Sequence, residues 1–400
     1  MGTTKNFFRE KKGWSFLKDT IFSHYLKPYI TKILNTYRPL HIYDCFAGKG
    51  IFDNGNKGSP IIIAEHINEI IQKNHGSKHI IFGHFIESKY AEELSQSLED
   101  YQNCEVLKGS YKQYIKKHLL DEENININIF LYIDPYGIKC LDFDSFQKVS
   151  EKDYSSLEIL MNFNSFGFLR EGFRLLKYDL RHFDEFDSDD ETYEIDDKNS
   201  IYRMNSIAGG DYWQAILQKK NEGKINMFEA EKFFMNEYTK RIKGIFKYTV
   251  NIPIRIKTTH LPKYRLIFAT NHPDGMILMA DNMNKAWNQI VENERKGQEV
   301  LFDIDVPDMR LIGDISIEHD ILSHIKNNEN ILIKELIVLL IEKYGINFSE
   351  KEYKDKLREM AADEKISIIR DPEFTPTGRK AKTLDYNDKR YKIYVRVRNG

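Results

Sequence analysis

Short apolar runs alternate with segments of helical periodicity through roughly the first 270 residues. The runs are typical of buried strands, because they are rich in β-branched and aromatic residues and are bounded by turn residues. Strands are expected at 41–45, 80–87, 105–107, 127–133, 157–163, 248–256 and 264–269. Between the first five, apolar residues recur at helical spacing. This alternation predicts an α/β fold with a parallel sheet and right-handed crossovers.

The remaining segments complete a three-part organisation. Residues 1–39 are expected to be helical, and a helical insertion is expected at about 167–248. The two strands after the insertion would close the sheet as an antiparallel hairpin. From Val306 the pattern indicates three helices, the third opened by a capping box at Ser349–Glu352, and then a β-hairpin. That order is typical of a winged helix-turn-helix. The expected domains are 1–39, 40–305 and 306–400.

Composition limits the function classes. The net charge of -2 gives no global attraction to nucleic acid, so any basic surface must be local. Cys45, Cys104 and Cys140 are far apart in the sequence and form no C-x-x-C pair, which argues against disulfides and a metal site. No signal peptide and no membrane-spanning run is recognisable. A cytoplasmic protein without a membrane association or a bound metal is expected.

Three expected strands end at a carboxylate. Asp44 lies near the end of the first, Glu87 ends the second, and Asp134 follows the strand at 127–133. In an open α/β sheet, ligands bind beyond the carboxyl ends of the strands. Gly48 and Gly50 follow Asp44 closely and allow the backbone to approach a ligand, since they have no Cβ. The spacing matches neither a dinucleotide fingerprint nor a phosphate-binding P-loop.

This order of motifs looks like that of an S-adenosylmethionine-dependent methyltransferase with a Rossmann-like class I sheet. In that interpretation the glycines lie under the methionine part of the cofactor and Asp44 faces its amino group or a water. Glu87 accepts hydrogen bonds from the two ribose hydroxyls, because one carboxylate can accept from a vicinal diol. The predicted cofactor-binding residues are Asp44, Phe46, Gly48, Gly50 and Glu87.

A second motif, Asp134-Pro135-Tyr136-Gly137, resembles the (Asp/Asn)-Pro-Pro-(Tyr/Phe) motif of methyltransferases that act on exocyclic amines of bases. The resemblance implies that Asp134 and the Pro135 carbonyl accept hydrogen bonds from the target amine and that Tyr136 stacks on the base. Catalysis would then consist mainly of positioning. The second proline of the motif is absent here, because Tyr136 follows Pro135 directly.

The C-terminal part carries local clusters of cations. Lys351, Lys354 and Arg358 share one face of the expected third helix. The expected wing adds Arg379, Lys380 and Lys382. In a winged helix these positions lie near phosphates, which predicts binding of RNA or DNA. A solvated helix face, or a winged helix that docks protein, is the alternative.

Longer motifs resemble the three-Cys-motif partner family over about residues 15 to 290. They are Tyr25-Leu26-Lys27-Pro28-Tyr29, Tyr43-Asp44-Cys45-Phe46-Ala47-Gly48-Lys49-Gly50, Gly58-Ser59-Pro60, Ile133-Asp134-Pro135-Tyr136-Gly137 and a segment from Tyr264 to Gly275. The resemblance implies a methyltransferase-like fold, similar in its motifs to the ribosomal RNA adenine-N6 methyltransferases. It also implies a partner protein with a three-cysteine motif. The family commonly has proline where this chain has Lys49, which adds a charge near a cationic cofactor.

The sequence therefore predicts an S-adenosylmethionine-dependent methyltransferase that acts on nucleic acid, at a base nitrogen. Two alternatives remain at this point. One is a non-catalytic nucleic-acid-binding subunit of a three-cysteine-motif protein. The other is a methyltransferase of small molecules or peptides, with the winged helix as a protein dock.

Overall fold

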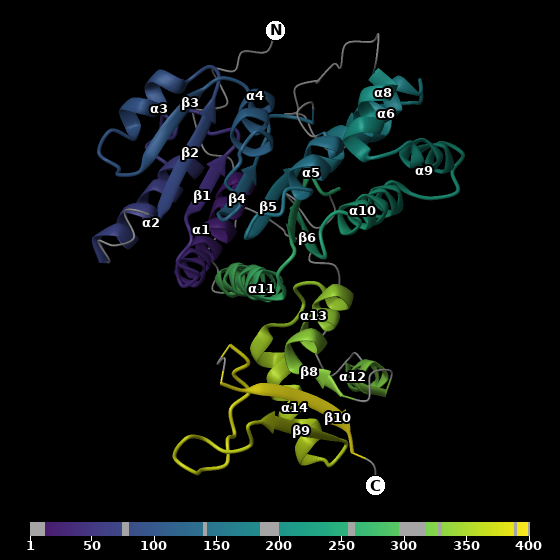
Figure 1. The fold of residues 1–400 in the computed structure, drawn as a ribbon. Coiled ribbons are helices and arrows are strands. Elements are labelled where there is room, and N and C mark those ends of the chain that lie inside the picture. Colours follow the sequence, from purple (N-terminus) through teal and green to yellow (C-terminus); the bar gives the residue numbers. More distant parts are fainter. Residues whose placement is uncertain are drawn as a thin grey trace. The chain divides into compact units, whose positions relative to one another are not determined.

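The computed structural model describes residues 13–73, 80–138, 142–184, 200–254, 261–295, 317–326, 330–387 and 390–398. The chain divides into two compact units (Figure 1). Unit 1 comprises residues 1–272 with 293–305, and unit 2 comprises residues 273–292 with 306–400. Cys140 and the expected domain boundary at Val306 lie outside the described residues.

Unit 1 is built on a seven-stranded sheet in the order β3-β2-β1-β4-β5-β7-β6. The strands from β3 to β5 are parallel, and β7 runs antiparallel to both β5 and β6. The strands are β1 (Leu40–Asp44), β2 (Ile81–Glu87), β3 (Cys104–Lys108), β4 (Asn128–Ile133), β5 (Ser156–Phe163), β6 (Tyr248–Ile254) and β7 (Tyr264–Thr270). The prediction of a mostly parallel α/β sheet that ends in an antiparallel hairpin is confirmed.

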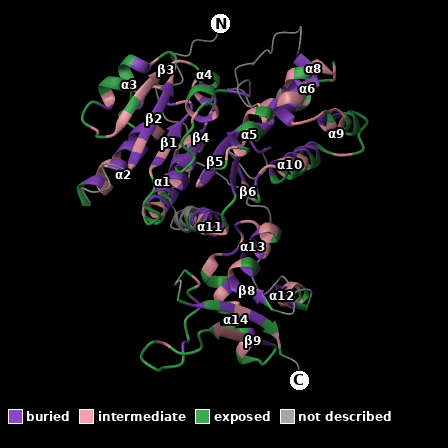
Figure 2. Ribbon diagram, viewed as in Figure 1, coloured by how far each residue is buried: buried purple, intermediate pink, exposed green. Residues whose placement is uncertain are grey.

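The middle of this sheet is buried along its whole length. Every residue of β4 and of β5 is buried (Figure 2). Continuous burial is typical of parallel strands, because helices cover both faces. The covering helices of the first half are α1 (Gly13–Leu34), α2 (Ser59–Lys73), α3 (Ala91–Ser97), α4 (Tyr111–Ile115), the π-helical turn η2 (Lys116–Leu120) and α5 (Phe143–Ser150).

Helix α1 is part of unit 1 and packs against α2 and the sheet. The ring of Phe22 stacks on Tyr132 of β4, with 4.2 Å between ring centroids. The Tyr25 hydroxyl donates a hydrogen bond to Glu158 of β5, which is buried. Burial raises the pKa of Glu158 to about 7, although hydrogen bonds from the Tyr25 and Thr270 hydroxyls act to lower it. These contacts attach α1 to the face of β4 and β5 on which Tyr132 and Glu158 lie.

Helices fill the segment between β5 and β6 in the described residues. They are α6 (Ser165–Leu175), α7 (Arg181–Asp184), α8 (Ser200–Ala208), α9 (Tyr212–Asn221) and α10 (Met227–Lys243). Helix α6 starts directly after β5 because the Asn164 side chain caps it, accepting from the Gly167 N–H at 2.7 Å. Helix α10 starts with a capping box formed by Asn226 and Glu229.

Unit 2 contains α11 (Pro273–Arg295, of which residues 273–292 belong to this unit) and a three-stranded antiparallel sheet in the order β8-β10-β9. Its other elements are α12 (Ile317–Lys326), β8 (Ile331–Leu332), α13 (Ile333–Tyr344), α14 (Glu350–Ala362), β9 (Ile366–Asp371) and β10 (Lys392–Val397). The capping box predicted at Ser349 and Glu352 is confirmed at the start of α14.

Contacts within unit 2 explain why residues 273–292 of α11 group with it, although the sequence placed them with the preceding domain. Lys334 forms an ion pair with Asp274 at 2.8 Å. The Asn284 side chain donates to the Ile346 carbonyl at 2.9 Å. The Glu350 N–H donates to Asp281 Oδ1 at 3.2 Å, which adds an acceptor at the start of α14.

Candidate functional site

The three strand-end carboxylates lie on neighbouring strands of the sheet of unit 1. β1 lies between β2 and β4, so Asp44 stands in register with Phe85 of β2 and Tyr132 of β4. The chain passes from β1 outward to β3 and then returns to β4 on the other side. Ligands of doubly wound sheets bind at such a switch point. The topology therefore brings Asp44, Glu87 and Asp134 to one edge of the sheet at its expected ligand crevice.

The glycine loop after β1 has a backbone that other residues would strain. Gly48 has a φ of +67° and Gly50 a φ of +82°, both in the left-handed region. A Cβ at Gly50 would lie 2.8 Å from Leu94 Cδ1. The Gly50 carbonyl also accepts from the Gly58 N–H at 2.7 Å, just before α2. The loop is therefore held between α3 and the start of α2.

Glu87 organises this loop through backbone hydrogen bonds. Its Oε2 accepts from the Gly48 N–H at 2.8 Å, and its Oε1 accepts from the N–H groups of Lys89 at 2.6 Å and Tyr90 at 3.1 Å. A carboxylate offers about four acceptor positions, so about one remains, on Oε2. About one acceptor position thus remains at Glu87, where the sequence predicted hydrogen bonds from two ribose hydroxyls.

Asp44 is completely buried and incompletely hydrogen-bonded. Its Oδ1 accepts from the Phe46 N–H at 3.3 Å. Its Oδ2 has no hydrogen-bond partner among the described residues. Burial raises the pKa of Asp44 to about 7; Asp134 and Asp19 add to this, while the Ser59 hydroxyl and the Phe46 N–H lower it. A buried carboxylate oxygen of this kind favours a ligand that donates a hydrogen bond or carries a positive charge.

Two further residues of the loop have defined surroundings. The half-buried Phe46 ring packs against Tyr111 at the start of α4, with 5.2 Å between ring centroids. Lys49 Nζ lies 3.2 Å from Asp53 Oδ1. Asp53 thus offsets the positive charge of Lys49.

Asp134 is held by three side chains from three elements. Lys18 Nζ of α1 lies 2.5 Å from Asp134 Oδ2, and the Tyr132 hydroxyl lies 3.3 Å from the same oxygen. The Asn162 side chain of β5 donates to Asp134 Oδ1 at 2.8 Å. The Lys18 side chain is only 5% exposed, and that of Asp134 is 25% exposed. About one acceptor position remains on the carboxylate, at Oδ1.

Sequence reasoning missed Lys18 and Asn162 as parts of this site. Asn162 carried a weak signal, because it lies near the end of the strand that pairs with β4. Its Oδ1 is buried and has no hydrogen-bond partner among the described residues. Lys18 carried no signal, since only the packing of α1 brings it to Asp134.

The residues after Asp134 differ in exposure. Pro135 is buried, whereas the Tyr136 side chain is 45% exposed. Gly137 has a φ of +85°, which the turn after Tyr136 requires. Tyr136 therefore lies at the surface, three residues after the buried end of β4.

The predicted nucleic-acid-binding cations lie in unit 2, and several are paired there. Lys354 lies 2.5 Å from Glu350 and 4.4 Å from the centroid of the Tyr386 ring. Arg358 lies 2.5 Å from Asp355, and Lys380 lies 2.8 Å from Glu373. Lys351, Arg379 and Lys382 are exposed. Two of the three predicted cations of α14 are thus paired with carboxylates of the same helix.

The part of the chain that the structure describes holds no cluster of His, Cys, Asp and Glu arranged to bind a metal ion. None of its helices combines the length and the apolar character that crossing a membrane requires.

No protein-family model and no curated protein matches this chain. Solved structures of spermidine synthases and methyltransferases are similar to it. The spermidine synthase of Thermotoga maritima is 10% identical, with 74% of this chain and 69% of that chain covered and a TM-score of 0.32. Geranyl diphosphate C-methyltransferase of Streptomyces coelicolor, solved with S-adenosyl-L-homocysteine, is 6% identical, with 61% and 73% covered and a TM-score of 0.22.

A Legionella pneumophila protein is 10% identical, with 69% of this chain and 93% of that chain covered and a TM-score of 0.36. Similarity at this level indicates neither a substrate nor a catalytic residue. The site is therefore defined by the residues of this chain, at the edge where β1, β2 and β4 end.

Proposed function

We propose that this chain is an S-adenosylmethionine-dependent methyltransferase that acts on a base nitrogen of nucleic acid. The observation that carries the proposal is the arrangement of Asp44, Glu87 and Asp134 at adjacent strand ends, with the glycine loop between the first two. A sheet with this order and an antiparallel closing hairpin is the one expected for a class I methyltransferase.

The residues around the glycine loop fit the cofactor. The unpartnered Oδ2 of Asp44 suits its amino group, and the remaining position on Glu87 Oε2 suits one ribose hydroxyl. Gly48 and Gly50 keep the loop free of side chains. When bound, S-adenosylmethionine supplies a methyl group on a sulfonium, which is already strongly electrophilic. The chain itself then has only to bind, orient and exclude water.

The surroundings of Asp134 favour a neutral amine as the methyl acceptor. Asp134 Oδ1 and Asn162 Oδ1 both retain acceptor capacity and suit the two hydrogens of an exocyclic amine. Lys18 offsets the charge of Asp134, so a cationic substrate would meet an ammonium group there. The exposed Tyr136 ring suits stacking on a base.

Unit 2 supports a nucleic-acid substrate by its order of elements. Helix α12, strand β8, helices α13 and α14 and the hairpin β9–β10 follow one another as in a winged helix. We therefore propose a winged helix that binds RNA or DNA. A partner protein with a three-cysteine motif stays a prediction from the family resemblance.

A second candidate function has one observation in its favour. Lys18 and Tyr132 already occupy Oδ2 of Asp134, so much of the acceptor capacity is used within the chain. A non-catalytic nucleic-acid-binding subunit needs no free acceptor at this position. A methyltransferase of small molecules or peptides would use the same cofactor site with a different acceptor.

The test is transfer of a labelled methyl group from S-adenosylmethionine onto total tRNA, rRNA and DNA. We expect transfer to one nucleic acid, reduced by about two or more orders of magnitude in Asp134→Ala, because positioning is lost. Asp144→Ala removes an exposed carboxylate of α5 and serves as the matched control. Cofactor binding without transfer to any nucleic acid would overturn the proposed substrate. Absence of cofactor binding would overturn the enzyme.

A further inference from the structure

The central strand of the sheet in unit 2 alternates between core and surface. Ile393 and Val395 of β10 are 1% and 0% exposed and pack into the unit. Lys392, Tyr394 and Arg396 alternate with them, so they stand on the opposite, outer face of the sheet. Strand β10 lies between β8 and β9 in this sheet (Figure 1), and of these three residues Tyr394 has a partner in register on both neighbouring strands.

Tyr394 is flanked by aliphatic side chains of both neighbouring strands. It stands in register with Leu332 of β8 and with Ile369 of β9. All three side chains are half-buried. They form a row of apolar side chains across the three strands that is partly open to solvent. The outer face therefore has an apolar centre with an aromatic ring, and a cation lies on either side of it along β10.

The cations of this face are less neutralised than those of α14. Among the described residues, Lys392 and Arg396 form no ion pair, and Asp371 is the residue in register with Lys392. Arg398, just beyond the strand, pairs with Glu364 at 3.0 Å, and both side chains are about half or more exposed. An exposed pair of this kind is weak and exchanges readily with a phosphate.

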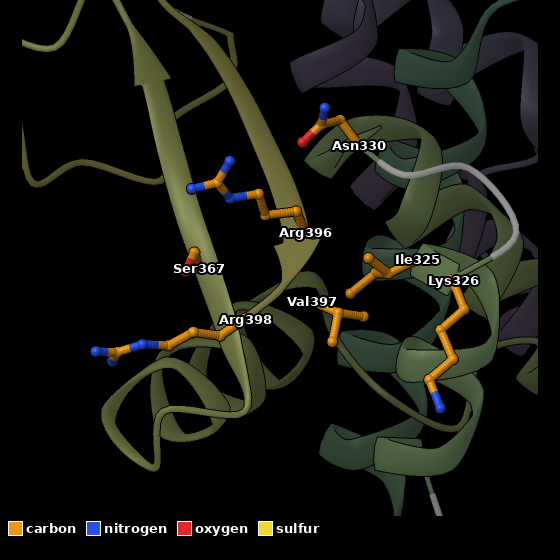
Figure 3. Close-up of a pocket in the computed structure, with 7 residues that line it drawn as sticks. All are labelled: Ile325, Lys326, Asn330, Ser367, Arg396, Val397 and Arg398. Carbon is orange, nitrogen blue, oxygen red and sulfur yellow. The ribbon is translucent and has the colours of Figure 1, made fainter. Parts of the chain in front are cut away.

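A hollow of about 710 Å³ adjoins the same end of β10. Its lining includes Arg396, Arg398 and Ser367, and Ser367 is the residue in register with Arg396 (Figure 3). In Figure 3 the two arginine side chains extend to the same side of β10, and Lys326 extends from α12 on the other side. Cations and hydroxyl groups of this kind suit phosphate oxygens.

We propose that this face binds single-stranded nucleic acid, with Tyr394 stacking on a base and Lys392, Arg396 and Arg398 contacting phosphates. The inference rests on the proposed function, since it locates the grip on the same nucleic-acid substrate. Charge complementarity selects the occupant, and a partly exposed ring among cations is how single strands are bound without base pairing. On the face of α14, from which the sequence predicted binding, Lys354 and Arg358 have carboxylate partners, whereas Lys392 and Arg396 of β10 form no ion pair among the described residues.

The test uses the full-length chain and fluorescent single-stranded and duplex oligonucleotides of RNA and DNA, with affinity followed by anisotropy. Tyr394→Ala is expected to weaken single-strand binding about 5- to 150-fold, as for the loss of one stacked base. Tyr394→Phe keeps the ring and is expected to bind as the unmodified chain does. Circular dichroism of each variant checks that unit 2 is folded.

Salt dependence tests the phosphate contacts. Lys392→Ala/Arg396→Ala is expected to lower the slope of log affinity against log salt by about 1.4, since single strands give about 0.7 per phosphate. The matched control is Lys351→Ala/Arg358→Ala on α14, which removes the same charge and is expected to leave the slope unchanged.

The outcomes separate this inference from the proposed function. The inference is overturned if the unmodified chain binds nucleic acid and the β10 variants bind equally well, or if only the α14 control weakens binding. In both cases nucleic acid remains the proposed substrate class. The inference is also overturned if the chain prefers duplex and the α14 control lowers the slope of log affinity against log salt. No binding and no methylation of any nucleic acid overturns both.

Discussion

The ammonium group of Lys18 lies 2.5 Å from Oδ2 of Asp134, although the two residues are 116 positions apart in the sequence. The Lys18 side chain is 5% exposed, so the ammonium is nearly removed from water. A buried charge persists only when it is paired and hydrogen-bonded. The pair therefore ties the N-terminal helix to the end of β4, at the proposed target site.

Breaking this pair from one side is expected to destabilise unit 1. Lys18→Met leaves a partly buried carboxylate without its charged partner, and we expect the free energy of unfolding to fall by about 2–4 kcal/mol. Urea denaturation measures it. The double variant Lys18→Met/Asp134→Asn removes both charges and is expected to recover much of the loss. Additive effects of the two changes would contradict a direct interaction.

The raised pKa of Asp44 predicts that stability depends on pH. The folded carboxyl has a pKa of about 7 against about 3.8 in the unfolded chain, so the folded state binds the proton more tightly. Stability from this group is thus full below about pH 4 and falls as the pH rises through 7, by up to about 4 kcal/mol. Glu158 contributes with the same sign. Thermal unfolding of Asp44→Asn from pH 5 to 8 should show a shallower decline than the unmodified chain; an equal decline would count against this assignment.

Cofactor affinity is expected to depend on pH in the opposite direction. A cofactor amino group is attracted by ionised Asp44, so the proton must leave before or during binding. Affinity for S-adenosylmethionine should then rise up to about tenfold per pH unit below pH 7 and level off above it. Titration calorimetry at pH 6, 7 and 8 measures this. A profile that is flat, or that persists in Asp44→Asn, would place the amino group elsewhere.

Removal of the Glu87 carboxylate is expected to affect both binding and the loop. Glu87→Ala loses the one proposed ribose hydrogen bond, and we expect cofactor affinity to fall by about 1.5–3 kcal/mol. It also leaves the N–H groups of Gly48, Lys89 and Tyr90 without their acceptor, so some stability should be lost as well. Glu92→Ala, an exposed carboxylate of α3, is the control. Unchanged affinity in a folded Glu87→Ala would refute the ribose role.

Two glycines with nearly the same φ allow backbone strain to be separated from steric conflict. Gly50 and Gly55 have φ values of +82° and +84°, but a Cβ at Gly55 meets nothing within 4 Å. Gly55→Ala should cost about 1–2 kcal/mol for the left-handed backbone alone. Gly50→Ala should cost about 1–3 kcal/mol more, since its Cβ meets Leu94 in the core. Equal losses of stability in the two variants would show that Leu94 moves aside freely.

Local sequence determined the sheet and the ends of its strands. Apolar runs such as Asn128–Ile133 are buried on both faces, and the order of strands and helices leaves few topologies for a parallel sheet. The same rules bring Asp44, Glu87 and Asp134 to one edge, because parallel strands end on the same side. The capping box at Ser349 could also be predicted from the sequence, because the cap and its partner Glu352 are only three residues apart.

Tertiary packing decided the ionic environment of each candidate residue. No local pattern links Lys18 to Asp134, or assigns the α11 residues 273–292 to unit 2, since such contacts depend on which helix faces meet. The cations of α14 have a helical spacing that suits phosphates, yet Glu350 and Asp355 pair with two of them. Charge along a sequence shows where cations occur; only the folded structure shows which of them remain without a carboxylate partner.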